Sequence, residues 1–180
     1  AISYKFKAHQ AITILENVSF QIGRTGVVTP VAHLKPVFIG GSVIKRASLH
    51  NKDFIKRLGL KIGDSVIIEK GGDVIPKVVS FLEEKRHLLC TDISFLKECP
   101  FCFSLLHKPN DEVNYYCTNS SNCLPQKIGC VEHFISRDAM NINTLGIKTI
   151  TLLFKQGIIL DVSSLYDLQI DSFTGLKGFG

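Results

Sequence analysis

Four cysteines in the middle of the sequence constrain its fold more than any other feature. They are Cys99, Cys102, Cys117 and Cys123, spaced as C-x2-C-x14-C-x5-C. The first two flank a tight turn, which brings their sulfur atoms together, and a short returning segment brings in the second pair. Four converging thiolates are the tetrahedral ligand set of a structural Zn²⁺ site, which leaves no open position for catalysis. The spacing therefore predicts a small zinc module, and we place it at residues 98–125.

Disulfide bonds are the alternative use of these cysteines. Disulfides are typical of secreted chains, and the sequence shows no charged start followed by an apolar stretch and a cleavage site. Six cysteines without an export signal point to a reducing cytoplasm and to metal binding. Cys90 and Cys130 stand outside the spacing pattern, and we assign neither of them a role.

The composition is that of an ordinary folded protein with a mild basic bias. Hydrophobic residues make up 45% of the 180 residues and charged residues 21%, which is enough to build a core. No run of 18 or more apolar residues occurs, so no membrane-spanning helix is predicted. The net charge of +5 is compatible with a nucleic-acid partner but does not specify one. The chain begins inside a β-like pattern without Met and stops at a turn signal, so we expect an internal fragment of a longer protein.

The part before the cysteines reads as a series of short strands. Alternating or continuous apolar runs occupy residues 18–22, 27–32, 42–49, 66–68 and 74–81. Between them, Asn51 suits the N-cap of a short helix that Gly59 ends. Five or so short strands with one inserted helix predict a closed β-barrel of the OB type over residues 11–97. Such barrels bind oligonucleotides, and a small barrel with another role is the alternative.

Basic residues of this part fall at predicted turns. Arg24 lies within a Gly-Arg-Thr-Gly turn, Lys45 and Arg46 follow a Gly-Gly pair, and Lys70 precedes another. Glycine lets the backbone approach a ligand closely, so a neighbouring cation suits a contact with phosphate. The alternative is that these side chains are solvated at surface turns.

After residue 125 the apolar period becomes helical. Leu145-Gly146-Ile147 joins two predicted helices by a tight turn, which predicts a helix-hairpin-helix region over residues 126–180. Backbone N–H groups at such a turn suit a DNA phosphate, and Lys148 lies beside it. A second turn of this kind, which contains Gly178 and Gly180, indicates a repeat. An ordinary helical hairpin is the alternative.

Several further motifs occur in one order along the chain. They are Tyr4-Lys5-Phe6, Gly23-Arg24-Thr25-Gly26, Thr29-Pro30-Val31-Ala32, Ala47-Ser48-Leu49-His50-Asn51, Ile62-Gly63-Asp64 and Gly72-Asp73-Val74-Ile75-Pro76. Together with the cysteines and the helical end, they closely resemble the bacterial NAD-dependent DNA ligases. The resemblance covers nearly the whole chain. It implies the DNA-binding portion of an enzyme that seals nicks in duplex DNA during replication and repair, with NAD as the AMP donor.

The resemblance also implies roles for individual residues. Residues 1–10 would end the adenylation domain, and Lys5 matches a family lysine that contacts the phosphate of NAD or AMP. Arg24 and Thr25 match positions that engage DNA around the nick. Lys70 matches a basic position that follows the DNA backbone, where arginine is common; lysine keeps the charge but lacks the bidentate guanidinium. The remaining expected DNA contacts are Val74, Ile75, Gly146, Lys148, Gly178 and Gly180.

The nucleophile of the family is missing. In the ligases a lysine within a Lys-x-Asp-Gly motif accepts AMP, and this sequence has no such motif. We therefore expect the chain to be inactive alone and the parent enzyme to use NAD and Mg²⁺ besides the structural Zn²⁺. The resemblance further implies a monomer in the bacterial cytoplasm. A nucleic-acid-binding module with an OB barrel and a zinc ribbon, but without enzymatic activity, is the alternative, and Lys5 at its start favours the ligase.

Overall fold

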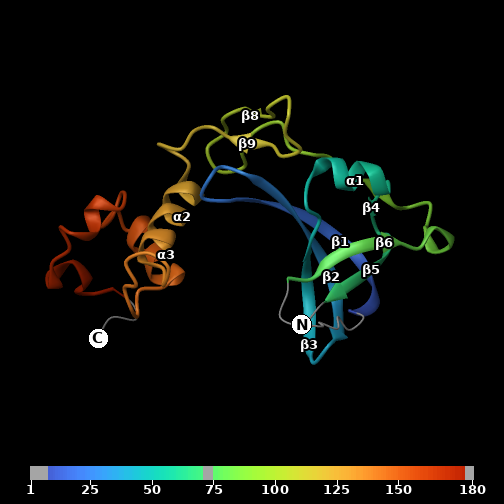
Figure 1. Ribbon diagram of the computed structural model, residues 1–180, viewed down its shortest axis with the longest axis horizontal. Helices are drawn as coiled ribbons and strands as arrows, with labels where there is room; N and C mark the ends of the chain where they lie inside the picture. The colour runs from blue at the N-terminus through green and yellow to red at the C-terminus, as the bar shows by residue number, and fades with distance from the viewer. Residues whose placement is uncertain (1–7, 71–74, 177–180) are drawn as a thin grey trace, which may run out of the picture.

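The computed structural model describes residues 8–70 and 75–176 of the chain. A β-barrel, a cysteine-containing segment and a helical segment follow one another, with the cysteine-containing segment between the other two (Figure 1). Residues 98–125 are called the cysteine module below. Four of the residues predicted to bind ligands lie outside the described ranges, namely Lys5, Val74, Gly178 and Gly180.

The barrel is closed by five strands in the order β1-β2-β3-β6-β5, which confirms the predicted closed barrel. The strands are β1 (His9–Ile22), β2 (Val28–Ile39), β3 (Ser42–Ser48), β5 (Ser65–Lys70) and β6 (Lys77–Phe81). Neighbouring strands are antiparallel except β3 and β6. Alternate side chains point inward and form one core, which includes Leu15, Ala32, Leu34, Val66, Ile68 and Val78.

The first strand is longer than the sequence pattern indicates. It begins at His9, before the alternation that starts at Val18. In its early part a polar side chain points inward and apolar side chains point outward. Thr13 is buried and its hydroxyl donates to the carbonyl of Lys35, whereas Ile12 and Ile14 are exposed. Alternation of apolar and polar residues therefore fails to mark this half of the strand.

The hairpin of β1 and β2 extends beyond the barrel. Pairing of β1 with β5 ends at Ile14, and pairing of β2 with β3 begins at Val31. Within the sheet, residues 20–22 and 28–30 pair only with each other. We call these two short segments the hairpin arm, and Figure 1 shows the hairpin running from the barrel to the region of α2.

Helix α1 (Lys52–Leu58) lies between β3 and β4 with the predicted ends. The side chain of Asn51 accepts a hydrogen bond from the backbone N–H of Phe54 at 2.8 Å. Gly59 ends the helix in the left-handed conformation, with φ of 61°. Both signals are local to the sequence, which is why they predict the helix correctly.

The remaining short elements surround the barrel and the cysteines. They are β4 (Lys61–Ile62), the 3-10 helix η1 (Glu83–Lys85), β7 (Thr91–Asp92), β8 (Leu106–His107) and β9 (Tyr116–Cys117). β4 pairs with β7, and β8 pairs with β9.

The helical segment contains α2 (Leu124–Ile135), α3 (Ile147–Lys155) and the 3-10 helices η2 (Ser163–Leu165) and η3 (Ile170–Phe173). Val131 and Ile135 of α2 pack with Ile150 and Leu153 of α3 in a second core. Residues 136–146 connect the two helices through an irregular loop, in which Asn141 and Thr144 have positive φ. The expected tight turn between the helices is therefore wrong, and the helix-hairpin-helix region stays a prediction.

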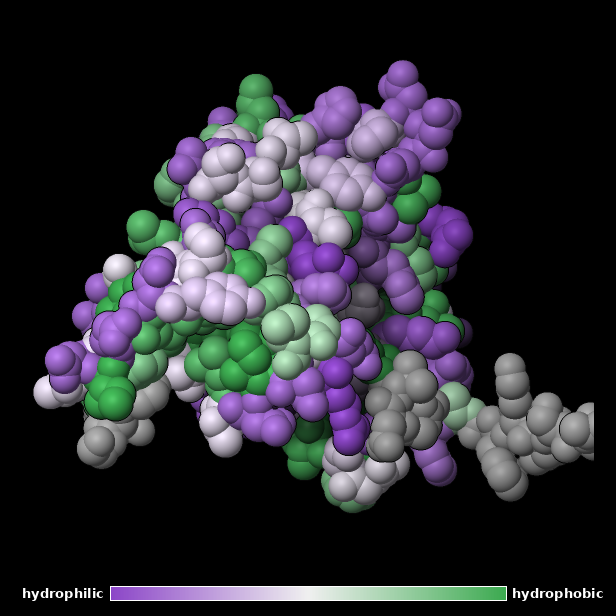
Figure 2. All heavy atoms as spheres, turned by 60° about the vertical axis from the view of Figure 1, so that its left-hand side comes forward, coloured by the Kyte–Doolittle hydropathy of each residue, from purple (hydrophilic) through white to green (hydrophobic). Residues whose placement is uncertain are grey.

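None of the helices within the described residues is long and apolar enough to cross a bilayer. On the face shown in Figure 2, hydrophobic side chains (green) lie in separate groups among hydrophilic ones (purple).

A buried ion pair joins the barrel to the loop after β6. The Asp64 side chain has no exposed surface, and its carboxylate accepts hydrogen bonds from Arg86 Nε at 2.8 Å and from the backbone N–H of Lys61 at 2.7 Å. Burial by itself raises the pKa of Asp64, but these hydrogen bonds outweigh it, so the pKa lies below its usual value. The carboxylate is therefore the form that the fold stabilises.

We expect Asp64→Asn to lower the free energy of unfolding by about 2–3 kcal/mol at pH 7, because it removes a charge-assisted hydrogen bond from a buried site. Since the folded-state pKa is the lower one, this contribution is present above the unfolded-state value of about 3.9 and is lost as the pH falls through the folded-state pKa. Urea denaturation should show a smaller difference between wild type and Asp64→Asn at pH 3 than at pH 7.

The matched control is Asp53→Asn, because Asp53 pairs with Lys108 at the surface. It should change the free energy of unfolding by less than about 1 kcal/mol. An equal cost of the two substitutions, or a pH-independent cost at Asp64, would contradict this account.

Candidate metal centre and nucleic-acid interface

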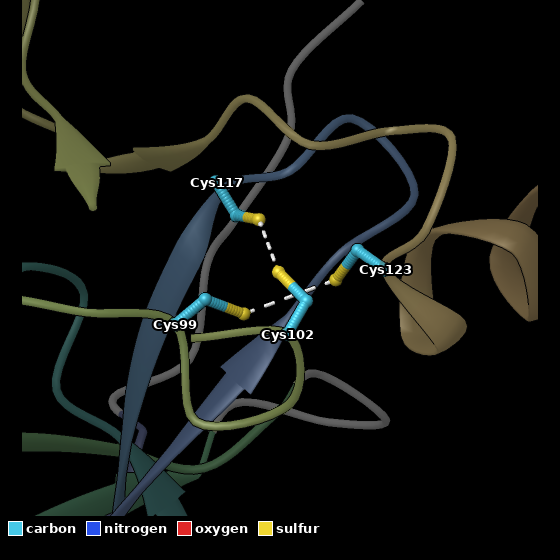
Figure 3. Close-up of side chains that lie close together, drawn as sticks. All are labelled: Cys99, Cys102, Cys117 and Cys123. Atoms are coloured by element: carbon cyan, nitrogen blue, oxygen red, sulfur yellow. Dashed lines mark hydrogen bonds between the residues drawn. The ribbon is translucent and has the colours of Figure 1, made fainter. Parts of the chain in front are cut away.

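The four predicted cysteine ligands come together from three parts of the cysteine module. Cys99 and Cys102 belong to one turn, Cys117 ends β9, and Cys123 precedes the first residue of α2 (Figure 3). The turn is closed by hydrogen bonds from the N–H of Cys99 to the carbonyl of Ser104 and from the N–H of Phe103 to the carbonyl of Cys99. Phe103 in the same turn has φ of 60°, in the left-handed region.

The sulfur atoms have the spacing of a tetrahedral metal site. All four lie within 4.8 Å of one another, with 3.8 Å between Cys99 and Cys123 and 3.4 Å between Cys102 and Cys117. Four thiolates about 2.3 Å from a central Zn²⁺ would be about 3.8 Å apart. A disulfide requires sulfur atoms about 2.05 Å apart, so the cluster can hold a metal ion and contains no disulfide.

The pKa values of the Cys102 and Cys117 thiols are shifted in opposite directions. Burial raises the pKa of the Cys117 thiol to about 12. At Cys102 burial acts in the same direction, but hydrogen bonds from the side chain and the backbone of Ser104 outweigh it and lower the pKa to about 6. A metal ion must therefore displace protons from buried thiols, which makes binding depend on pH.

The two other cysteines do not join the cluster. Cys130 is an exposed residue of α2, and Cys90 is half-buried, with its sulfur close to Gly63. Neither belongs to a group of metal-ligating side chains within the described ranges 8–70 and 75–176. The spacing of the four cysteines in the sequence thus identifies the four thiols that lie together and could hold a metal ion.

The Gly-Arg-Thr-Gly turn lies at the tip of the hairpin arm. Arg24 and Thr25 are exposed, whereas Gly26 is buried and has φ of 83°. The turn is attached to β9, because the N–H of Cys117 donates to the carbonyl of Gly26 at 2.8 Å and the N–H of Val28 donates to the carbonyl of Tyr115 at 2.8 Å. The exposed cation is therefore carried by a turn that the cysteine module fixes.

An apolar cluster reinforces this attachment. Ile22 and Val28 of the arm are buried together with Cys99, Cys117 and Cys123. Around them, the ring of Phe95 meets the rings of Phe20 and Tyr115, with centroids 4.9 Å and 5.0 Å apart. Lys52 of α1 donates to the hydroxyl of Tyr115 at 3.1 Å. The arm, the clustered cysteines and α1 thus share one interface.

The other predicted DNA contacts of the barrel occupy different environments. Lys70 is half-buried, and its ammonium donates to Ser42 Oγ at 2.9 Å. Ile75 is 74% exposed and lines a hollow of about 300 Å³ with Gln21 and Thr29, which are paired in the hairpin arm. Ile75 and the arm therefore belong to the same face of the barrel, whereas Lys70 already has a partner within the protein.

Arg46 is a basic residue whose location the sequence misjudges. It lies within β3, opposite His33 of β2, and not at a turn. Its side chain lines the same hollow as Ile75. Simple alternation does not place it, because the buried residues of this strand, Ile44 and Ala47, are three positions apart and Arg46 is exposed between them.

Gly146 and Lys148 lie at the start of α3. Gly146 is the N-cap, with no side chain to bond the first turn and open space around its Cα, and Lys148 is exposed in that turn. Free N–H groups and a cation at a helix N-terminus have the chemistry to receive an anion. The structure thus keeps these two predicted residues together and accessible to solvent.

Comparison with known proteins defines the class of this fold. Residues 12–88 match the family model of the NAD-dependent DNA ligase OB-fold domain. The barrel is therefore an OB-fold domain of the kind found in these ligases, which confirms the predicted type of barrel.

The relatives extend the similarity to the whole chain. It is 48% identical to a DNA ligase of Phocaeicola vulgatus over 180 residues, which is 100% of this chain and 27% of that protein. It is 50% identical over 178 residues to a DNA ligase of Parabacteroides distasonis and 48% identical over 176 residues to one of Chlorobaculum tepidum, which covers 98% of this chain each time and 27% and 26% of the relatives. The chain is thus similar over its full length to these DNA ligases and spans about a quarter of their length.

We expect the chain to bind one Co²⁺ under reducing conditions, with the thiolate charge-transfer and tetrahedral d–d absorption that four sulfur ligands produce. Cys99→Ser should weaken binding strongly, because it removes a buried ligand, and Cys130→Ser should leave it unchanged. Acidification should release the metal, because protons compete for the thiolates. Equal effects of the two serine variants would contradict the assignment of the ligands.

Proposed function

We propose that the chain is the DNA-binding portion of an NAD-dependent DNA ligase, which seals nicks in duplex DNA during replication and repair. The observation that carries the proposal is the similarity of the entire chain to bacterial DNA ligases, together with the match of residues 12–88 to their OB-fold domain. In this proposal residues 1–10 end the adenylation domain, residues 11–97 are the OB-fold domain, residues 98–125 are the zinc module and residues 126–180 are the helix-hairpin-helix region.

Zinc is the proposed metal of the cysteine module. Four sulfur donors suit Zn²⁺ better than hard cations, which prefer oxygen ligands. Cys99, Cys102, Cys117 and Cys123 would complete the coordination, so the ion would have no open position for substrate. Its role would be structural, because a short segment with few buried apolar residues depends on the metal for its folding free energy.

Nicked duplex DNA is the proposed partner, bound mainly through its phosphates. Arg24 and Thr25 are exposed at the tip of the hairpin arm, and Ile75 lies exposed beside the strands of that arm. A guanidinium and a hydroxyl suit phosphate oxygens, and an exposed aliphatic side chain suits the floor of the minor groove. Gly146 and Lys148 would add a phosphate contact at the N-terminus of α3. Lys70 would contact the DNA backbone only after its hydrogen bond to Ser42 breaks.

The covalent chemistry would be carried out elsewhere in the parent enzyme. In the proposed reaction a lysine takes up AMP from NAD in the presence of Mg²⁺, and nicotinamide mononucleotide leaves. AMP then passes to the 5′-phosphate of the nick and frees the lysine. The 3′-hydroxyl finally attacks that phosphate, which forms the phosphodiester bond and releases AMP. Lys5 would contact the phosphate of NAD or AMP from the end of the adenylation domain. This chain would hold the nick in place, as part of a monomeric enzyme of the bacterial cytoplasm.

We expect Arg24→Ala to weaken binding of a fluorescently labelled nicked duplex by about tenfold, because one charge-assisted phosphate contact is lost. The slope of the logarithm of the affinity against the logarithm of the salt concentration should fall by about 1. The matched control is Lys85→Ala, which removes the same charge from the exposed η1 turn at the opposite end of the barrel from α2 (Figure 1). Equal losses for both variants would refute a specific role for Arg24.

We expect the chain by itself to form no covalent adenylate when incubated with NAD and Mg²⁺, because its sequence has no Lys-x-Asp-Gly motif. Intact-protein mass spectrometry would detect the added mass of AMP. A lysine of this chain that became adenylated would show that the nucleophile is present and would contradict the proposed division of labour.

A further inference from the structure

One buried polar side chain joins segments that are distant in sequence. Among the residues that the structure describes, the buried polar side chains are those of Thr13, Asp64 and Gln126. Thr13 and Asp64 bond to groups of the barrel and of the loop that follows it. Gln126 lies in the first turn of α2, is 3% exposed and bonds outside its helix. A buried amide is costly unless its hydrogen bonds are made, so its partner is informative.

The partner of Gln126 is a metal ligand residue. Its Nε2 donates to the backbone carbonyl of Cys117 at 3.0 Å in a buried environment. Cys117 in turn donates its backbone N–H to the carbonyl of Gly26 at 2.8 Å. One amide side chain therefore connects α2 to β9 and, through β9, to the tip of the hairpin arm.

The space around Gly26 confirms how closely these groups approach. A Cβ placed on Gly26 would lie 2.3 Å from the carbonyl oxygen of Cys117 and 3.2 Å from Oε1 of Gln126. On the same side of α2, a Cβ placed on Gly129 would lie 2.9 Å from Cβ of Arg24. Residues three positions apart share a face of a helix. This face of α2 thus contacts the turn at both Gly26 and Arg24.

We propose that Gln126 is a positioning residue, which fixes the Arg24–Thr25 turn in one arrangement for contact with DNA. The inference rests on the proposed role of Arg24 in binding the nick. The turn is exposed and flanked by two glycines, so without external contacts it would lose conformational freedom on binding. Ordering a residue costs conformational entropy. The hydrogen bond of Gln126 orders the Arg24–Thr25 turn in the free protein. Less conformational entropy is then lost on binding, which raises the affinity for DNA.

The test uses the metal-loaded 180-residue chain and a labelled nicked duplex. Gln126→Met keeps the length of the side chain and removes the hydrogen bond to Cys117. Gln156→Met is the matched control, because Gln156 is an exposed residue at the end of α3. We expect Gln126→Met to weaken nick binding by about fivefold and to lower the salt slope, as Arg24→Ala does. Gln156→Met should change neither quantity.

A double-mutant cycle separates positioning from general support of the fold. If Gln126 acts through Arg24, the double variant Arg24→Ala/Gln126→Met should bind no more weakly than Arg24→Ala alone. A residue that only supports the fold would give additive losses and would leave the salt slope unchanged. Additive losses, or wild-type binding by Gln126→Met, would overturn the proposal.

Hydrogen exchange provides a second measurement that does not depend on DNA. In Gln126→Met the amides of residues 23–27 should exchange faster, while amides of the barrel core remain protected. Unchanged exchange at the turn, or unfolding of the whole chain, would overturn the positioning role. If Arg24→Ala binds the nick like wild type while the turn still loosens in Gln126→Met, the proposed role of Arg24 fails and the coupling of Gln126 to the turn stands.

Discussion

The backbone pairing between Gly26 and Cys117 is the interaction on which the arrangement of the parts depends. It places Cys117, one of the four clustered cysteines, next to the tip of a hairpin that originates in a barrel more than ninety residues earlier in the chain. Gly26 permits the pairing because its φ of 83° and its lack of a Cβ leave room for the Cys117 carbonyl. The barrel, the cysteine module and α2 therefore meet at one point. A structural change in any of these three parts would therefore alter the position of the exposed Arg24–Thr25 turn.

The cysteine module has two kinds of support. Its sulfur atoms can share a metal ion, and three of its cysteines are buried against Ile22 and Val28 of the hairpin arm. The apolar contacts do not need the metal, whereas the convergence of four ionised thiolates does, because like charges repel without a cation between them. We therefore interpret the module as a connection between the barrel and the helical segment.

The sequence predicts best what neighbouring residues determine. Asn51 and Gly59 bound α1 correctly because a cap acts within one helical turn. The spacing of the four cysteines separates them from Cys90 and Cys130 because the geometry of a metal knuckle is also local. Features that depend on tertiary contacts escape prediction. The early half of β1 has an exposed Ile12 and a buried Thr13. Lys70 donates a hydrogen bond to Ser42. The partner of Gln126 is the carbonyl of Cys117, which lies near it only because β9 and α2 are adjacent in the fold.

The length of the hairpin arm has a consequence for spacing along DNA. Residues 20–22 and 28–30 carry the Arg24 turn beyond the closed barrel, and an extended strand advances about 3.3 Å per residue. Adding two residues to each strand would move the tip outward by about 7 Å, which is about two nucleotide steps along one DNA strand. The same insertion would keep the alternation of faces, so the barrel would accept it. The arm thus sets the distance between the barrel surface and the Arg24 cation at its tip.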